Sequence, residues 1–257
     1  MLAAGAGAGL INTVVGSGTL ITFPTLLALG YPPVTANVSN NIGLVFGGLT
    51  GTWGYRRELS GTRATLARLV PASFVGGIVG ALLLLRLPAR AFAAIVPVLI
   101  VLALVLVVLQ PRIAAAAARR RERAAAAGED AAGRPRGAVG PLVQGGTLLA
   151  GIYGGYFGAA QGVLLVGLLG ALLEEPLQRV NGIKNLLSAV VNGVAAVTFL
   201  LVAPDRADWL VVLLIAVGSI GGGVVGAGVG RRLPPRVLRS VIVVVGLVAV
   251  VHLLAAL

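Results

Sequence analysis

The only lysine of the chain, Lys184, stands among asparagine residues in the sequence Asn181-Gly182-Ile183-Lys184-Asn185. This stretch opens an apolar run that reaches residue 202, and a further amide, Asn192, lies two helical turns beyond Asn185. An ammonium group and several amides are costly in hydrocarbon unless they face protein, water or a ligand. These residue types predict a site that attracts a small anion. A second interpretation stays open, in which Lys184 lies at the lipid headgroups and reaches water or phosphate.

A similar group of amides occurs in the first half of the chain, in Asn37-Val38-Ser39-Asn40-Asn41. On a helix, Asn37 and Asn41 share one face, as Asn181 and Asn185 do, because residues four apart are neighbours. In this alignment Asn40 takes the position of Lys184. The predicted site is therefore asymmetric, with its one fixed charge on one side.

Two glycine-rich stretches, Asn12–Thr19 and Tyr153–Gly162, interrupt long apolar runs. A helix that restarts after such a break presents unpaired N–H groups and a partial positive charge, which together bind anions. Ser17, Thr19 and Gln161 would add hydroxyl and amide groups there. The alternative is that these glycines only permit close helix packing. Because two such stretches stand at equivalent places, we favour the anion site.

The sequence thus yields one set of candidate substrate-binding residues: Lys184, Asn181, Asn185, Gln161, Asn192, Asn37, Asn41, Ser17, Thr19 and Asn12.

Several other chemistries find no support in the sequence. All 8 acidic residues fall in loops or at the ends of apolar segments, which leaves no carboxylate for a proton relay inside the membrane. The chain has no cysteine, which excludes disulfides and cysteine metal sites. We find no Walker motif, no metal-ligand cluster and no nucleophile beside a base. We therefore expect no enzyme activity, no cofactor and no metal.

Composition indicates a polytopic α-helical membrane protein. Hydrophobic residues make up 58% of the chain and charged residues 11%, against roughly 25% charged in soluble domains. Apolar runs of about 20 residues are long enough to cross a bilayer as helices. The net charge of +12 comes from basic residues between apolar runs, a pattern of cytoplasmic loops rather than of nucleic-acid binding. The predicted apolar segments are residues 2–29, 36–55, 66–85, 91–109, 142–173, 183–202, 209–230 and 237–256.

The two halves of the chain resemble each other. Gly76-Gly77-Ile78-Val79-Gly80-Ala81 matches Gly222-Gly223-Val224-Val225-Gly226-Ala227, and an Arg-Leu-Pro motif follows at the same distance in both halves. We infer an internal duplication of four apolar segments each. The predicted organisation is a first membrane repeat at 1–110, an Arg/Ala-rich cytoplasmic linker at 111–140 and a second membrane repeat at 141–257.

Arginine placement predicts that the two repeats have opposite orientations in the membrane. Cytoplasmic loops carry an excess of arginine. In the first repeat the arginines concentrate in residues 56–68, whereas in the second the equivalent loop, 205–208, is poor in them and the next loop, 231–239, is rich. This inversion fits six full spans plus two re-entrant hairpins at the glycine-broken first and fifth segments, with both termini outside. The alternative is eight simple spans with both termini inside.

The same residues carry a resemblance to a known family. Gly16-Ser17-Gly18, the following Tyr31-Pro32-Pro33-Val34-Thr35-Ala36-Asn37, and the repetition of this plan in the second half resemble the sulfite exporter TauE/SafE family of membrane transporters. The resemblance covers nearly the whole chain except residues 112–140. It implies transport of sulfite, sulfoacetate or another organosulfonate across the cytoplasmic membrane, usually outward. The sequence departs from the commoner three-glycine pattern at Ser17 and at Ala159-Ala160-Gln161.

Together these features predict a secondary transporter of a small sulfur-containing anion that works by alternating access. It would be a multi-pass protein of the bacterial cytoplasmic membrane. Its expected partners are the small anion, membrane lipid and, in a homodimer, a second copy of the chain, but not nucleic acid. A passive anion channel is the alternative function.

Overall fold

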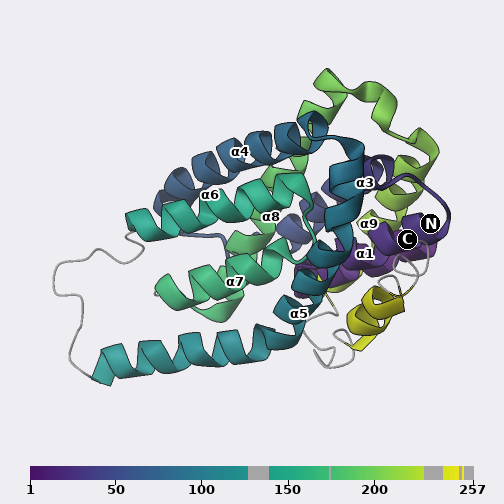
Figure 1. The fold of residues 1–257 in the computed structure, drawn as a ribbon. Helices are drawn as coiled ribbons and strands as arrows, with labels where there is room; N and C mark the ends of the chain where they lie inside the picture. Colours follow the sequence, from purple (N-terminus) through teal and green to yellow (C-terminus); the bar gives the residue numbers. More distant parts are fainter. Residues whose placement is uncertain (127–138, 174, 229–239, 249–250, 252–257) are drawn as a thin grey trace.

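The computed structural model describes residues 1–126, 139–173, 175–228, 240–248 and 251, and in these the chain is helical without strands. This confirms the all-α fold expected from the sequence (Figure 1). The first half contains α1 (Leu2–Val14), α2 (Thr19–Ala28), α3 (Pro33–Gly54), α4 (Arg63–Arg86) and α5 (Ala89–Ala126). The second half contains α6 (Pro141–Tyr156), α7 (Gln161–Leu172), α8 (Leu177–Val202), the short 3₁₀ helix η1 (Pro204–Arg206) and α9 (Trp209–Gly228).

Four helices in the described part of the chain are long and apolar enough to cross a membrane: Arg63–Arg86, Ala89–Ile113, Leu177–Val202 and Trp209–Gly228. The sequence predicts six full spans. Two of these six predicted spans are not among the four helices. The first is α3, which has 22 residues but carries Asn37, Ser39, Asn40 and Asn41 on its buried face. Half of the predicted last segment, 237–256, lies outside the described residues, as do His252 and the whole arginine-rich loop 231–239.

Helix α5 runs beyond its predicted end near residue 109 and continues to Ala126, inside the predicted linker. Residues 114–126 are mainly alanine and arginine, two of the best helix formers, which explains this extension. Figure 1 shows that α5 changes direction along its length, as expected of a helix that contains Pro97 and Pro111. The remaining linker residues, 127–138, lie outside the described residues.

The central pair of helices, α3 and α8, runs antiparallel. Val34 at the start of α3 lines the same cavity as Val202 at the end of α8. At the other end, Gly182 near the start of α8 faces Leu59, just beyond α3. The sequence repeat pairs α3 with α8, and an inverted repeat predicts this antiparallel arrangement.

Each half packs its first helix against the fourth helix of the other half. Helix α1 lies along α9, and α6 lies along α4, as Figure 1 shows. Glycines bring these backbones together: a Cβ atom on Gly5 would lie 2.9 Å from the Ile215 carbonyl oxygen, and one on Gly76 would lie 2.5 Å from the Leu148 carbonyl oxygen. The glycine motifs noticed as a sequence repeat are therefore helix-packing surfaces in both halves.

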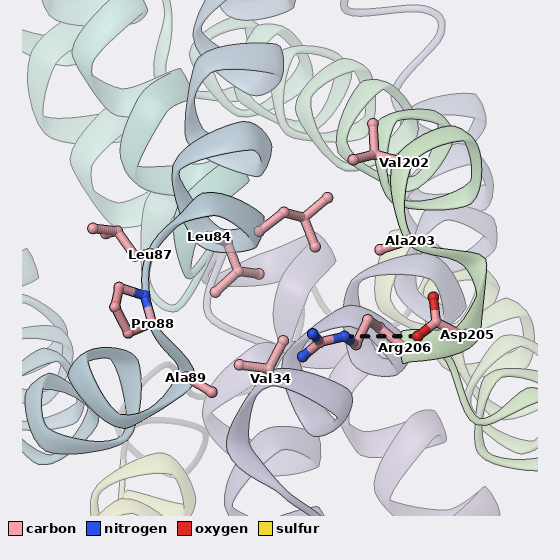
Figure 2. A pocket seen from close by; sticks show the side chains of 10 residues that line it. Val34, Leu84, Leu87, Pro88, Ala89, Val202, Ala203, Asp205 and Arg206 are labelled. Carbon is pink, nitrogen blue, oxygen red and sulfur yellow. Dashed lines mark ion pairs between the residues drawn. The ribbon is translucent and has the colours of Figure 1, made fainter.

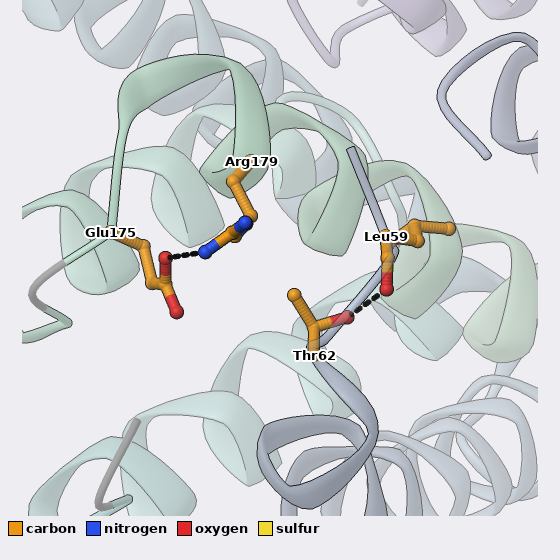
Figure 3. Close-up of polar contacts among 4 residues, drawn as sticks. All are labelled: Leu59, Thr62, Glu175 and Arg179. Atoms are coloured by element: carbon orange, nitrogen blue, oxygen red, sulfur yellow. Dashed lines mark hydrogen bonds and ion pairs between the residues drawn. The ribbon is translucent and has the colours of Figure 1, made fainter. Parts of the chain in front are cut away.

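The arginine-rich α3–α4 connection lies at the same end of the molecule as the return from the linker. Arg68 donates from Nη1 to the Val139 carbonyl oxygen at 3.3 Å. The connection is ordered by local bonds such as Thr62 Oγ1 to the Leu59 carbonyl oxygen at 2.7 Å (Figure 3). The Arg56 guanidinium lies 4.0 Å from the centre of the exposed Trp53 ring, a cation–π contact suited to a membrane interface.

Candidate functional site

The two glycine-rich stretches lie against each other in the middle of the molecule. Helix α1 ends at Val14 and α2 begins at Thr19, while α6 ends at Tyr156 and α7 begins at Gln161. The amide of Gly162 donates to the Gly16 carbonyl oxygen at 3.0 Å, which joins the two interruptions directly. The sequence-predicted groups on these stretches are thereby brought to one place.

The backbone of both stretches requires glycine at defined positions. Gly16 and Gly158 have φ angles of +87° and +79°, a region that side chains with a Cβ rarely adopt. A Cβ atom on Gly16 would also lie 2.5 Å from the Gly162 Cα atom. Ala160 adopts the left-handed region as well, with φ +60°, and the Tyr153 hydroxyl secures this turn by donating to the Ala159 carbonyl oxygen at 2.7 Å.

Lys184 is fully buried and holds the end of α1. Its Nζ atom donates to the carbonyl oxygens of Asn12 at 3.0 Å and Thr13 at 3.1 Å. Asn185 Nδ2 adds a bond of 3.3 Å to the Thr13 carbonyl oxygen. These carbonyls belong to the last turn of α1, the negative end of the helix dipole, where a cation is favourable. The side-chain stem passes Gly162, where a Cβ atom would lie 2.9 Å from Lys184 Cδ.

The equivalent amides of α3 bind both interruptions, Asn37 the one after α6 and Asn40 the one before α2. Asn37 Nδ2 donates to the Tyr156 carbonyl oxygen at 2.9 Å, and Tyr156 is the last residue of α6. Asn40, the counterpart of Lys184, donates from Nδ2 to Thr19 Oγ1 at 3.2 Å and accepts a hydrogen bond from the Thr22 hydroxyl. Thus α8 secures the end of α1 and α3 secures the end of α6, so each half holds the broken segment of the other.

Several buried polar atoms around this centre have no hydrogen-bond partner in the described residues. They are Ser17 Oγ, Asn37 Oδ1, Asn41 Oδ1, Gln161 Nε2 and Ser188 Oγ. The amides of Ser17, Gly18 and Thr19, at the start of α2, also donate to no backbone carbonyl there. An unpaired buried polar group costs about 1–3 kcal/mol, so such a cluster marks a place where water or a ligand belongs.

Among the described residues, Lys184 also has no counter-ion. The ion pairs in the described part of the chain are Arg179–Glu175 at 2.7 Å (Figure 3) and Arg206–Asp205 at 3.8 Å (Figure 2), and neither includes it. Carbonyl oxygens hold two of its three N–H groups, but they carry only partial charges. A small anion would supply the missing opposite charge.

Three predicted residues contribute less than expected. Asn12 contacts Lys184 through its backbone carbonyl, not through its side-chain amide. Asn181 is partly exposed and makes no side-chain hydrogen bond among the described residues, unlike its counterpart Asn37. Asn192 is nearly buried but is likewise not bonded to the other polar residues of the described site.

Sequence reasoning omitted Asn40, Thr22 and Ser188 from the candidate residues. Asn40 was detectable, because it stands where the second half has Lys184. Thr22 and Ser188 carry no sequence signal of their own, since isolated hydroxyl residues are common in apolar helices. No cluster of histidine, cysteine or acidic residues able to hold a metal ion occurs in the described part of the chain.

Comparison with known families decides what kind of protein this is. The family described as "Sulfite exporter TauE/SafE" matches residues 1–253. The chain belongs to the TauE/SafE family. Among curated proteins, the chain is similar to "Probable membrane transporter protein YfcA" of Escherichia coli (strain K12), 26% identical over 96% of this chain and 86% of the relative. "Probable membrane transporter protein ORF9" of Sinorhizobium sp is also 26% identical, over 96% of this chain and 88% of the relative. No solved structure matches this TauE/SafE protein.

Proposed function

We propose that this TauE/SafE protein is a secondary transporter that exports a small sulfur-containing anion, such as sulfite, sulfoacetate or another organosulfonate. It would act in the bacterial cytoplasmic membrane by alternating access. The family name supports the substrate class, and the names of the relatives support a membrane transporter. The observation that carries the proposal is the fully buried Lys184, which has no carboxylate partner and lies beside unpaired polar groups.

The donors around the two interruptions suit an oxyanion. The third N–H of Lys184, the Ser17 hydroxyl, the Gln161 amide and the free backbone amides at the start of α2 all offer hydrogens. Charge-assisted bonds of this kind are the strong ones. The two unpaired amide oxygens, of Asn37 and Asn41, suit a water molecule or a hydroxyl on a protonated anion.

The two helix starts contribute unequally to this proposal. At α7 the Gly162 amide is already bonded to the Gly16 carbonyl oxygen, so it is not free for an anion. At α2 the amides are free, and the Thr19 hydroxyl lies close to the facing glycine stretch, 3.8 Å from where a Cβ atom on Gly158 would be. The anion would therefore bind at the start of α2, with Lys184 approaching from α8.

The packing supports an inverted repeat that rocks about this site. Equivalent helices α3 and α8 run antiparallel, and the pairs α1–α9 and α4–α6 repeat the same contact in the two halves. Inverted repeats with broken helices at their interface are a common plan of secondary transporters. The interruptions would be the tips of two re-entrant hairpins.

A counterflow experiment tests transport and separates a carrier from a passive channel. Proteoliposomes are loaded with unlabelled sulfoacetate and diluted into a trace of labelled sulfoacetate. A carrier transiently accumulates label above equilibrium, because unlabelled anion leaving the vesicle returns the site to the outside. When a permeant counter-ion holds the membrane potential at zero, a channel only equilibrates the label. Absence of any sulfonate or sulfite flux would refute the proposal, and equilibration without accumulation would favour the channel.

The matched variants are Lys184→Met and Arg179→Gln. Both remove one positive charge from the beginning of α8, but Arg179 is part-exposed and paired with Glu175, whereas Lys184 is buried and unpaired. We expect loss of counterflow only in Lys184→Met.

A further inference from the structure

Two cavities lie at opposite ends of the molecule and are built from equivalent pieces of the two halves. The first, of about 400 Å³, lies where α4 ends, α8 ends and α3 begins. The second, of about 350 Å³, lies where α9 and α3 end. Since α4 corresponds to α9 and α8 corresponds to α3, one cavity is the counterpart of the other. Each cavity has arginine in its lining.

The first cavity combines apolar walls with one cation. Its walls include Val34, Leu84, Leu87 and Val202, and Figure 2 shows the Arg206 side chain extending from η1 towards Val34. Arg206 meets Asp205 only at 3.8 Å, and the Asp205 side chain is 80% exposed, so the ion pair is weak. The guanidinium therefore keeps most of its capacity to bind another oxyanion. An apolar wall beside it suits the carbon portion of an organic anion.

The second cavity is lined by Arg56, Arg57 and Glu58 together with glycine and alanine of α3 and α9. Arg56 is engaged, because it lies over the Trp53 ring and donates to the Trp53 carbonyl oxygen at 3.1 Å. Arg57 is exposed and has no such partner in the described structure. Arg57 can therefore bind a ligand in the second cavity, as Arg206 can in the first.

Both cavities adjoin the central site through one helix. In α3, Val34 of the first cavity lies on the same face as Asn37 and Asn41, whose amide oxygens are unpaired. Towards the other end of α3, Gly54 lines the second cavity, and Gly51, one turn earlier, packs on Thr13, the residue whose carbonyl oxygen holds Lys184.

We propose that these cavities are the outer and inner vestibules of the transport path, and that Arg206 and Arg57 collect a small organic anion at the two faces. Arg206 lies at the end opposite the arginine-rich connection, and cytoplasmic loops are the arginine-rich ones, so its cavity faces outward. This inference rests on the proposed transport of a sulfonate. It adds which residue recruits the anion on each side.

The inference predicts an effect that depends on the side of the membrane. Arg206→Gln raises the KM for sulfoacetate presented at the outer face about threefold to tenfold and weakens its dependence on ionic strength, because a charge at the rim acts on encounter. The maximal rate and the KM at the inner face stay unchanged. Arg57→Gln gives the reverse pattern.

Right-side-out and inverted membrane vesicles that contain each variant provide the test. Wild-type flux is measured first, and its absence would refute the proposed function. Wild-type flux without a KM shift in either variant would refute only the proposed role of the two cavities as vestibules. Effects on the wrong face, or on both faces equally, would overturn that role too. Reconstitution in purely zwitterionic lipid identifies the ligand: a KM shift that needs anionic lipid would show that Arg206 binds a lipid headgroup instead of the substrate.

Discussion

Replacing Lys184 with methionine separates anion binding from a purely structural role. In the unliganded protein, the change has opposing effects. It removes a buried ammonium without a counter-ion, whose burial costs several kcal/mol, together with its bonds to two carbonyls. The Thr13 carbonyl oxygen keeps Asn185, while the Asn12 carbonyl loses its partner, at about 1–3 kcal/mol. These effects nearly cancel, so we expect thermal stability without ligand to change little.

The loss of anion binding in Lys184→Met is not offset by any opposing gain. A hydrogen bond to a charged group contributes about 1.5–3 kcal/mol, which corresponds to a loss of affinity of roughly 10-fold to 150-fold. The assay is the rise in the denaturation midpoint of the purified protein as sulfoacetate, sulfite or taurine is titrated in, with counterflow as the functional readout. Sulfonate-induced stabilisation should be lost at concentrations that saturate the wild type.

Asn185 stood among the predicted binding residues, but its amide nitrogen is used by the Thr13 carbonyl oxygen; Asn185→Ala is therefore the matched control, because it removes a bond to that oxygen without removing a charge. It should lower the midpoint slightly and retain the ligand-induced shift. Full ligand-induced stabilisation in Lys184→Met would refute the reasoning. So would an equal loss of ligand response in both variants, since that would assign the effect to the end of α1 rather than to the anion.

The remaining predictions concern the contact between the interruptions and the orientation of the chain. Gly16→Ala should abolish transport and lower the free energy of unfolding by several kcal/mol, because the φ of +87° is strained for alanine and the new Cβ would lie 2.5 Å from Gly162 Cα. Gly30→Ala is the control, since Gly30 has a similar φ but no atom within 4 Å of the new Cβ. It should lower the free energy of unfolding by only about 1–2 kcal/mol. Since the chain has no cysteine, single cysteines report topology. Ser60→Cys should react with an impermeant maleimide only after the cells are permeabilised, because residue 60 is predicted to be cytoplasmic. Asp205→Cys should react in intact cells. The opposite pattern would contradict the predicted orientation.

The sequence was sufficient to predict the all-α fold and to single out Lys184, which the structure places in the buried interior. Composition identifies apolar helices, and a lone lysine in an apolar run has few explanations. It did not show that the ammonium would bind the carbonyls at the end of α1, because α8 and α1 are far apart in the chain and only tertiary packing brings them together. For the same reason the bond between Gly162 and Gly16 was not predictable from two stretches that looked alike.

The limits of the apolar segments were predicted less well than their existence. Helix α5 continues to Ala126 because alanine and arginine favour helix after the apolar residues end. Helix α3 has the length of a span, yet its asparagines and glycines reduce its hydrophobicity. Asn40 shows that an exact comparison of the two halves, position by position, would have enlarged the candidate site, since it replaces Lys184 and binds Thr19.

The exchange of partners between the halves has a consequence for biosynthesis. Helix α1 finds its main packing surface in α9, which the ribosome makes only after α2 to α8. Until then its glycine face has no matching backbone, and its last carbonyls lack the ammonium of α8. Neither half is therefore complete as a folding unit, and the N-terminal segment has to wait in the membrane for the C-terminal half. Co-expression of the two halves as separate chains should restore what neither forms alone.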